Sequence, residues 1–196
     1  FIDTDPDTFN MCIKDLKTKL GRDFAAVIFV DTFGNPSGIE DIHKLCKKFN
    51  VPLLEDGACA LGSEVDGVKV GSIADITCFS FHPRKLLNTG EGGAISTNNN
   101  IYANELMIKL AAGSSGKAEI GLNFTDFGFN FRLTEIQALM GWHQLKIIDE
   151  MIARRLEIKH SYINSLVTLG FRPQKINDNI KHNTQSIVFT VPKGLD

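Results

Sequence analysis

Three groups of polar or small residues directly follow apolar runs that are typical of β-strands. Asp56 ends the run VPLLED, and the run SFHPRK places Ser80, His82 and Lys85 after the apolar segment ADITCF. A glycine-rich run, GEGG at 90–93, follows them. Ligands of open α/β sheets bind beyond the carboxyl ends of the strands. These residues are therefore the first candidates for chemistry.

A carboxylate, a hydroxyl and a lysine at neighbouring strand ends are the groups that a pyridoxal 5'-phosphate site requires. The lysine amine forms a Schiff base with the aldehyde. The carboxylate keeps the ring nitrogen protonated, so that the ring can accept electrons. Hydroxyl and backbone N–H groups hold the phosphate. The sequence predicts such a site at Lys85, Asp56 and Ser80, with no metal.

Each of these residues, taken alone, has a simpler explanation. A lysine after a strand is usually solvated at the surface, and an aspartate there usually stabilises a turn. His82, beside Pro83, fits a turn better than a catalytic role, and we keep it only as a candidate on the substrate side of the site. The prediction depends on the combination of residues.

Composition excludes several classes of protein. The chain has 196 residues, 43% of them hydrophobic and 22% charged, which is typical of a globular protein. The 21 basic and 23 acidic residues leave a net charge of −2, so no basic field attracts nucleic acid. The longest apolar run, residues 25–30, is too short to span a membrane.

Four cysteines are scattered along the chain without a C-x-x-C pair or a histidine at ligand spacing: Cys12, Cys46, Cys59 and Cys78. This pattern disfavours a zinc site and a disulfide framework and favours a reducing cytoplasm. Cys46 and Cys78 lie in apolar patterns, which predicts that both are buried.

The apolar patterns of the first half predict an α/β fold, a three-layer domain with a mainly parallel sheet. Ser37 and Glu40 have the spacing of a capping box that starts a helix reaching Phe49. The run at 25–30 predicts a strand buried on both faces. The other expected strands cover residues 51–54, 73–81 and 93–97, the last returning beside the one before it.

The second half predicts a helix over residues 101–112 and a polar loop over 113–126. Thr134 and Gln137 form a second capping box, which starts one long helix over 136–156. A strand at 186–191 completes the pattern. We assign residues 1–150 to a large domain, and 151–196 to a connecting helix and the start of a small C-terminal domain. Because the chain opens without Met and closes at Asp196 just after a strand, we expect a piece of a longer protein.

The chain resembles the DegT/DnrJ/EryC1/StrS aminotransferases along essentially its whole length. The resemblance rests on EDGACALGSEVDGVKVGSIADITCFSFHPRKLLNTGEGGAISTN, and on FIDTDPDTFN, DTFGNPSGIEDI and GFNFRLTEIQALMGWHQL in the same order. This family comprises fold-type I pyridoxal phosphate enzymes that act mostly on nucleotide-linked keto sugars. The resemblance implies an incomplete large domain of that fold.

The resemblance also implies individual roles. Lys85 matches the Schiff-base lysine, Asp56 the carboxylate on the ring nitrogen and Ser80 the phosphate-binding hydroxyl. Asn130 matches an asparagine that reaches the phosphate of the neighbouring subunit, which implies a homodimer with shared active sites. Cys59 stands where the family often carries Gln or His near the ring hydroxyl, and a thiol is a weaker hydrogen-bond partner.

The implied function is transfer of an amino group from glutamate or glutamine to a nucleotide-linked keto sugar. Related sugar dehydratases carry His in place of the Schiff-base lysine, so Lys85 favours transamination. A non-catalytic binding or regulatory domain with the same fold stays open. An unrelated nucleotide-binding domain would need a glycine-rich turn after the first strand, and residues 31–35 do not form one.

Overall fold

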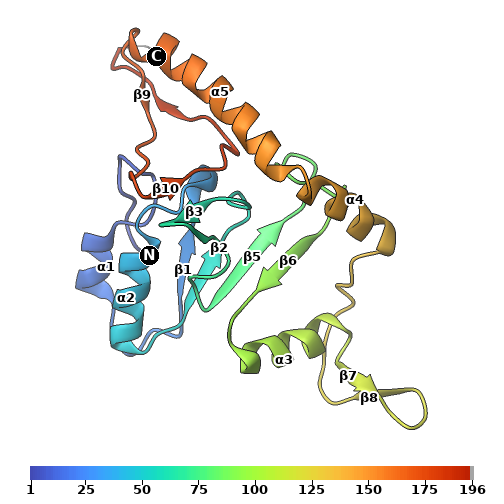
Figure 1. Ribbon diagram of the computed structural model, residues 1–196. Coiled ribbons are helices and arrows are strands. Elements are labelled where there is room, and N and C mark those ends of the chain that lie inside the picture. Colours follow the sequence, from blue (N-terminus) through green and yellow to red (C-terminus); the bar gives the residue numbers. More distant parts are fainter. Residues whose placement is uncertain (195–196) are drawn as a thin grey trace.

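A computed structural model describes residues 1–194 and shows a four-stranded sheet as the centre of the fold (Figure 1). Leu195 and Asp196, the last residues of the segment predicted to start the C-terminal domain, lie outside the described residues. The strand order is β1-β2-β5-β6, with the first three strands parallel and β6 antiparallel to β5. This confirms the predicted α/β class and mainly parallel sheet. The strands are β1 (Val27–Val30), β2 (Leu53–Asp56), β5 (Ile76–Ser80) and β6 (Gly93–Ser96).

The register of the sheet brings the predicted site residues to one edge and one face. Asp56, the last residue of β2, pairs with Cys78 of β5. Ser80, two residues further along β5, pairs with Gly93. Because side chains alternate between faces, Asp56, Cys78 and Ser80 share one face of the sheet.

The opposite face of the sheet is covered by helices α1 (Ile13–Lys19) and α2 (Ile39–Phe49). Their apolar side chains join those of β1 and β2 in the main core, which contains Leu16, Val27, Phe29, Ile39, Ile42, Cys46 and Leu53. Burial of this continuous apolar cluster is the main source of stability for such a layer.

The face that carries Asp56 is open among the described residues. Ile28 and Val30 of β1 are 60% and 46% exposed, so the prediction that this strand is buried on both faces is wrong. Cys78 is exposed on the same face, contrary to prediction, whereas Cys46 is buried as predicted. Apolar character in the sequence does not itself supply the second covering layer.

Helix α2 does not start with the predicted capping box. Its N-cap is Gly38, with φ of 96°, and no side chain caps the helix. The hydroxyl of Ser37 instead donates a hydrogen bond of 2.6 Å to Asn35 Oδ1, inside the buried loop after β1. A glycine serves here because the left-handed conformation costs it little.

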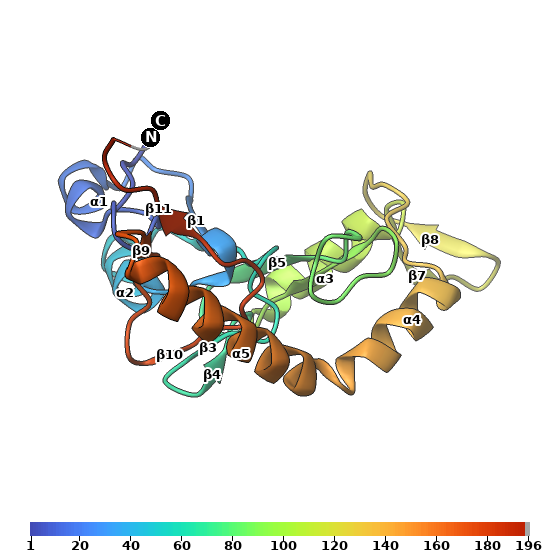
Figure 2. The same ribbon diagram turned by 90° about the horizontal axis from the view of Figure 1, so that it is seen from above.

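The capping box of Thr134 and Gln137 is confirmed at the start of α4 (Glu135–Leu145). The predicted single helix over 136–156 is wrong, because a second helix, α5 (Ile148–Val167), follows after a break. Ile147 leaves helical geometry at the break, with φ −115° and ψ 11°, and the two helices meet at an angle (Figure 2). The apolar pattern runs through both helices and therefore hides the break.

Helix α3 (Asn100–Leu110) matches the predicted helix over 101–112 and is capped by the Asn99 side chain. The predicted loop after it contains a hairpin, β7 (Ser114–Lys117) and β8 (Leu122–Phe124), so that prediction is corrected. The remaining elements are short: η1 (Thr32–Gly34), β3 (Glu64–Val65), β4 (Val68–Lys69), β9 (Arg172–Pro173), β10 (Ile180–Lys181) and β11 (Phe189–Thr190). Strand β11, paired with β9, is all that forms of the predicted strand at 186–191.

The segment after α5 returns to the loop that follows β1. Gln174 Nε2 donates hydrogen bonds to the carbonyls of Thr8 (2.7 Å) and Thr32 (3.0 Å). Asn35 Nδ2 donates to the Lys175 carbonyl at 3.0 Å. The division into domains at residue 150 stays a prediction. Within residues 1–194, no helix has the length and apolar character needed to cross a membrane.

Candidate active site

Lys85 lies in the loop after β5, and its amine meets the end of β2. Its Nζ is 3.1 Å from Sγ of Cys59, three residues beyond Asp56. Among the ion pairs of residues 1–194, none includes Lys85, although the side chain is half-buried. An amine with no carboxylate partner is available for covalent chemistry.

One oxygen of the Asp56 carboxylate is hydrogen-bonded within the turn that follows β2. Its Oδ1 accepts a hydrogen bond of 3.0 Å from the Ala58 N–H, and no hydrogen bond within the described part of the chain uses Oδ2. A Cβ added at Gly57 would lie 2.9 Å from Thr77 Cγ2, so packing against β5 fixes this turn. One carboxylate oxygen is thus held in place while the other can accept from a positively charged donor.

Ser80 and His82 organise the turn that leads to Lys85. The Ser80 hydroxyl accepts from the His82 N–H at 3.3 Å, which leaves its own proton free to donate. His82 Nδ1 accepts from the Arg84 N–H at 3.2 Å, and the Lys85 N–H donates to the His82 carbonyl at 2.9 Å. The imidazole therefore takes part in a turn, and its substrate-side role stays a prediction.

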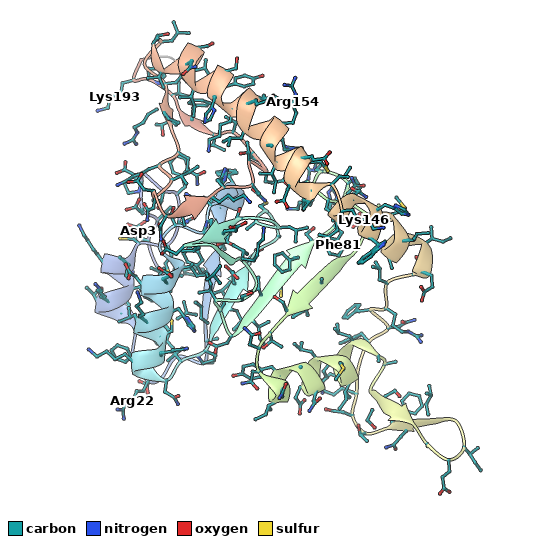
Figure 3. All side chains as sticks on the ribbon, in the orientation of Figure 1. Asp3, Arg22, Phe81, Lys146, Arg154 and Lys193 are labelled. Atoms are coloured by element: carbon teal, nitrogen blue, oxygen red, sulfur yellow. The ribbon has the colours of Figure 1, made fainter. Side chains whose placement is uncertain are left out.

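Two glutamines of α4 hold the loop beyond Lys85. Gln144 brackets Asn88, donating to its carbonyl at 2.6 Å and accepting from its N–H at 3.1 Å. Gln137 Nε2 donates to the Glu91 carbonyl at 2.9 Å. Figure 3 shows Phe81, at the start of this loop, near the α4–α5 break that carries Lys146. The loop between β5 and β6 is therefore anchored to α4.

A third glutamine, Gln185, contacts this loop and was not singled out from the sequence. It lies 100 positions after Lys85, and its side-chain amide forms hydrogen bonds with the Arg84 carbonyl and the Leu86 N–H. No local pattern predicts a contact over such a distance. Hydrophobic periodicity reports only local structure.

The glycines at 92 and 93 are required by packing. A Cβ at Gly93 would lie 2.6 Å from the Phe79 carbonyl oxygen, and one at Gly92 would lie 2.8 Å from Leu133 Cδ1. Gly92 also has φ of 142°, which side chains rarely adopt. These contacts explain why glycine occupies both positions, and no bound ligand is needed for that explanation.

Behind the sheet, on the face opposite Asp56, lies a buried acidic pair that sequence analysis did not identify. Asp31 and Glu55 are each 1% exposed. Glu55 Oε2 accepts from Thr77 Oγ1 at 2.5 Å and from the Gly71 N–H at 3.3 Å, whereas no donor reaches either Asp31 oxygen within residues 1–194. Burial, and then the charge of Glu55, raises the pKa of Asp31 well above its usual range.

Asn130 lies apart from the strand-end residues within one chain. Its Oδ1 accepts from Arg132 Nε at 2.8 Å, and its backbone bridges to Ala111 at the end of α3. The side chains around it are strongly exposed aromatics: Phe127, Phe129 and Phe131. The structure therefore brings together Lys85, Cys59, Asp56 and Ser80, but not Asn130.

Among the described residues, Lys85 supplies an amine without an ion pair, Asp56 a carboxylate oxygen without a donor, and Ser80 a hydroxyl that can donate. These groups fit the needs of pyridoxal phosphate. The carboxylate suits the ring nitrogen, and the hydroxyl suits the phosphate. Within residues 1–194, no group of three or more His, Cys, Asp or Glu side chains is placed to hold a metal ion.

Comparison with known proteins identifies the family of the chain. The model of the DegT/DnrJ/EryC1/StrS aminotransferase family matches residues 1–195. A Campylobacter jejuni protein named UDP-4-amino-4,6-dideoxy-N-acetyl-beta-L-altrosamine transaminase is 38% identical over 165 residues, 83% of this chain and 44% of the relative. GDP-perosamine synthase of Escherichia coli O157:H7 is 37% identical over 172 residues, 85% of this chain and 46% of the relative.

Among solved structures, PseC of Helicobacter pylori, an aminotransferase involved in the biosynthesis of pseudoaminic acid, superposes with a TM-score of 0.91 at 29% identity. The match covers 97% of this chain and 52% of PseC. The chain thus spans about half the length of the relatives it matches. A family model that covers nearly every residue, together with the shared fold, shows that the chain belongs to the DegT/DnrJ/EryC1/StrS aminotransferase family.

Proposed function

We propose that the full-length protein is a pyridoxal phosphate-dependent aminotransferase that moves an amino group from glutamate or glutamine to a nucleotide-linked keto sugar. The observation that carries this proposal is the Lys85 amine, which forms no ion pair within residues 1–194 and lies near the end of β2 beside the Asp56 turn. The family and the UDP- and GDP-sugar names of two relatives support the substrate class. The cytoplasm is the proposed location, since the four cysteines of the described residues are free.

When bound, the cofactor supplies an aldehyde and an electron-accepting ring. Lys85 would hold it through the amine, Ser80 would donate its hydroxyl proton to the phosphate, and the free Asp56 oxygen would keep a proton on the ring nitrogen. The Lys85 amine would also remove the proton from the donor's α-carbon and return one to the substrate carbon that receives nitrogen. A histidine at position 85 would suit a dehydratase, so the lysine favours transamination.

The Cys59 thiol is the proposed neighbour of the cofactor's ring hydroxyl. Its contact with Lys85 Nζ at 3.1 Å places sulfur within the same group of strand-end side chains. A thiol is a weak hydrogen-bond donor and acceptor. Its hydrogen bond to the ring hydroxyl would therefore be weaker than one from an amide or imidazole at this position.

We further propose that the protein is a homodimer in which Asn130 completes the partner's site. The Asn130 side chain is exposed and lies in an aromatic segment in which Phe127 and Phe131 are 71% and 67% exposed. Exposed aromatic residues with few charges are typical of homodimer interfaces.

Covalent trapping of the cofactor tests this function. The purified full-length protein is mixed with pyridoxal phosphate, reduced with borohydride and digested, and the modified lysine is located by mass spectrometry. We expect the label on Lys85, and its loss in Lys85→Ala but not in Lys69→Ala, which changes an exposed lysine. A label on another lysine would disprove the role of Lys85. No label at all would favour a non-catalytic domain.

A further inference from the structure

A single side-chain amide holds the backbone on both sides of Lys85. The Leu86 N–H donates to Gln185 Oε1 at 2.7 Å, and Gln185 Nε2 donates to the Arg84 carbonyl at 2.9 Å. These groups belong to the two residues that flank Lys85 in the sequence. Both bonds are made by a residue that follows α5, far from the loop in the chain.

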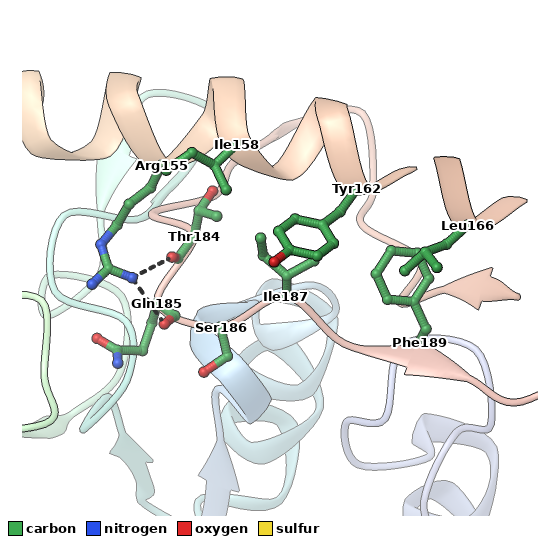
Figure 4. Close-up of a pocket in the computed structure, with 9 residues that line it drawn as sticks. All are labelled: Arg155, Ile158, Tyr162, Leu166, Thr184, Gln185, Ser186, Ile187 and Phe189. Carbon is green, nitrogen blue, oxygen red and sulfur yellow. Dashed lines mark hydrogen bonds between the residues drawn. The ribbon is translucent and has the colours of Figure 1, made fainter. Parts of the chain in front are cut away.

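Gln185 is itself held in place by its neighbours. Its backbone N–H donates to Asn183 Oδ1 at 2.9 Å. Arg155 of α5 donates from Nη1 to the carbonyls of Gln185 and Thr184, each at 3.3 Å, and Figure 4 shows this side chain reaching from the helix to both carbonyls. A side chain fixed at its own backbone loses little further freedom when it binds the loop.

The same segment also holds the other side of the site. Asn183 Nδ2 donates to the carbonyls of Cys59 (2.8 Å) and Leu61 (2.9 Å). The Asn183 N–H also donates to Ser63 Oγ at 3.0 Å. Asn183 is fully buried, so these bonds are shielded from water. Residues 183–185 therefore connect the backbone of Cys59 to the backbone around Lys85.

We propose that Gln185 is a positioning residue for Lys85: by bonding both flanking residues it fixes the direction in which the lysine leaves the loop and keeps the amine at the end of β2. The contact of Lys85 Nζ with Cys59 Sγ is the observed result. A lysine has four rotatable side-chain bonds, so a mobile backbone would add to an already large freedom. Small misplacements of a reacting group are costly to its chemistry. This inference rests on the proposed function of Lys85.

The test compares Gln185→Met with Gln144→Met in the full-length protein. Methionine keeps the length of glutamine and removes both hydrogen bonds. Gln144 is a matched control, because its amide makes the same two kinds of hydrogen bond to the backbone of Asn88. Asn88 lies in the same loop but does not flank Lys85. Gln185→Glu is the second variant, since it keeps an acceptor for the Leu86 N–H and loses the donor to the Arg84 carbonyl.

Two measurements separate positioning from simple loop stability. Amide hydrogen exchange of Leu86 in the cofactor-free protein should accelerate in Gln185→Met and not in Gln144→Met. The rate of trapping pyridoxal phosphate on Lys85 should fall at least about tenfold in Gln185→Met. The pH midpoint of the visible absorbance of the holoenzyme should shift as well. In Gln144→Met the trapping rate and the pH midpoint should equal those of the wild type. In Gln185→Glu both should lie between the wild-type values and those of Gln185→Met.

The outcomes distinguish this proposal from the proposed function. If pyridoxal phosphate is not trapped on Lys85 of the wild-type protein, the proposed function fails. The positioning role of Gln185 is tested separately: unchanged exchange of the Leu86 amide in Gln185→Met would refute it. If trapping occurs on Lys85 but its rate and the absorbance midpoint are unchanged in Gln185→Met, then Gln185 is a structural residue only. Should Gln185→Met fail to fold, the same comparisons are made with Gln185→Glu.

Discussion

The thiol of Cys59 and the amine of Lys85 lie 3.1 Å apart, although they come from the ends of different strands. Each sits beyond the carboxyl end of its strand, β2 for the cysteine and β5 for the lysine. The contact makes Cys59 a direct probe of the space around the lysine, because a group attached to this sulfur would occupy the space beside the amine.

Alkylation of Cys59 should block covalent trapping of pyridoxal phosphate on Lys85. The experiment is done with iodoacetamide on cofactor-free protein carrying Cys78→Ser, because Cys78 is exposed and would also react. Mass spectrometry measures alkylation at Cys59 and the label at Lys85 on the same sample. Adding Cys59→Ser should restore trapping after iodoacetamide treatment. Full trapping with Cys59 alkylated would show that the two groups do not share a pocket.

Asp56→Asn should fold and lose most of its turnover. A neutral amide would not keep a proton on the ring nitrogen of a bound cofactor, and the ring would then accept electrons less well. If Asp56 only stabilises the turn through Ala58, the variant should keep nearly normal stability and turnover, because the asparagine side-chain oxygen can accept the same hydrogen bond. Melting temperature and kcat measured on the same preparation separate these cases, and normal turnover would exclude the proposed role.

His182 should make the protein less stable as the pH falls from about 6.5 toward 4. The imidazole is buried, Nε2 contacts the Phe33 carbonyl at 3.2 Å, and Nδ1 contacts the Thr184 N–H at 3.2 Å and Lys159 Nζ at 3.3 Å. Burial, and then the charge of Lys159, lowers the pKa of His182 from 6.5 to about 4. Between these values the unfolded chain binds a proton that the folded chain does not, so folding is favoured at the higher pH.

Urea unfolding at pH 7 and pH 4 measures this effect. The stability difference between wild type and His182→Gln should shrink by roughly 3 kcal/mol at the lower pH, which is the free energy of such a pKa change. His160→Gln, at an exposed position of α5, serves as the control for replacing an imidazole by an amide. An equal pH dependence in wild type and His182→Gln would contradict this account.

Asp31→Asn should stabilise the protein, and more strongly as the pH rises. Because the pKa of Asp31 is raised in the folded protein, the folded protein keeps a proton that the unfolded chain releases. The stability of the wild type therefore falls as the pH rises from the unfolded pKa of Asp31 to its folded pKa. An asparagine stays neutral and can donate to Glu55. We expect a gain of about 1–3 kcal/mol at pH 8, the usual cost of an unsatisfied buried polar group. Asp23→Asn, at an exposed position, is the control for loss of one charge.

Local patterns predicted the strands and the residues at their ends because both are encoded by neighbouring residues. Apolar runs followed by Asp56 and by Ser80 place these side chains at strand ends, and the structure has both strands ending there. The Thr134 capping box was predictable for the same reason, since all of its bonds lie within four residues.

Other features depended on what packs against a segment. Ser37 has the spacing of a helix cap, but a buried asparagine binds its hydroxyl. Cys78 has apolar neighbours in sequence, yet lies on the face of the sheet that the described residues leave open. Gln185 contacts the lysine loop across 99 positions to Leu86. Patterns of one or two turns carry no information about such contacts.

Subunit complementation tests the proposed dimer and the role of Asn130. In the structure Asn130 lies beside the end of α3 and accepts from Arg132, away from Lys85, so within one chain it does not reach the site. If it serves the partner's site, a mixed dimer of Lys85→Ala and Asn130→Ala subunits has one site with both changes and one site with neither. Each variant alone should be nearly inactive, and random exchange should restore about a quarter of wild-type activity.

The control for this experiment is a mixture of Lys85→Ala with Asp56→Asn. Both residues come from the same strand-end site, so every site in any such dimer carries at least one change, and activity should stay low. Recovery with Asn130→Ala but not with Asp56→Asn would place Asn130 across the subunit boundary. No recovery in either mixture, with subunit exchange shown by native mass spectrometry, would mean that Asn130 acts within its own subunit or not at all. An active strict monomer would refute the shared site directly, because the exposed aromatic segment around Asn130 would then have no second subunit to contact.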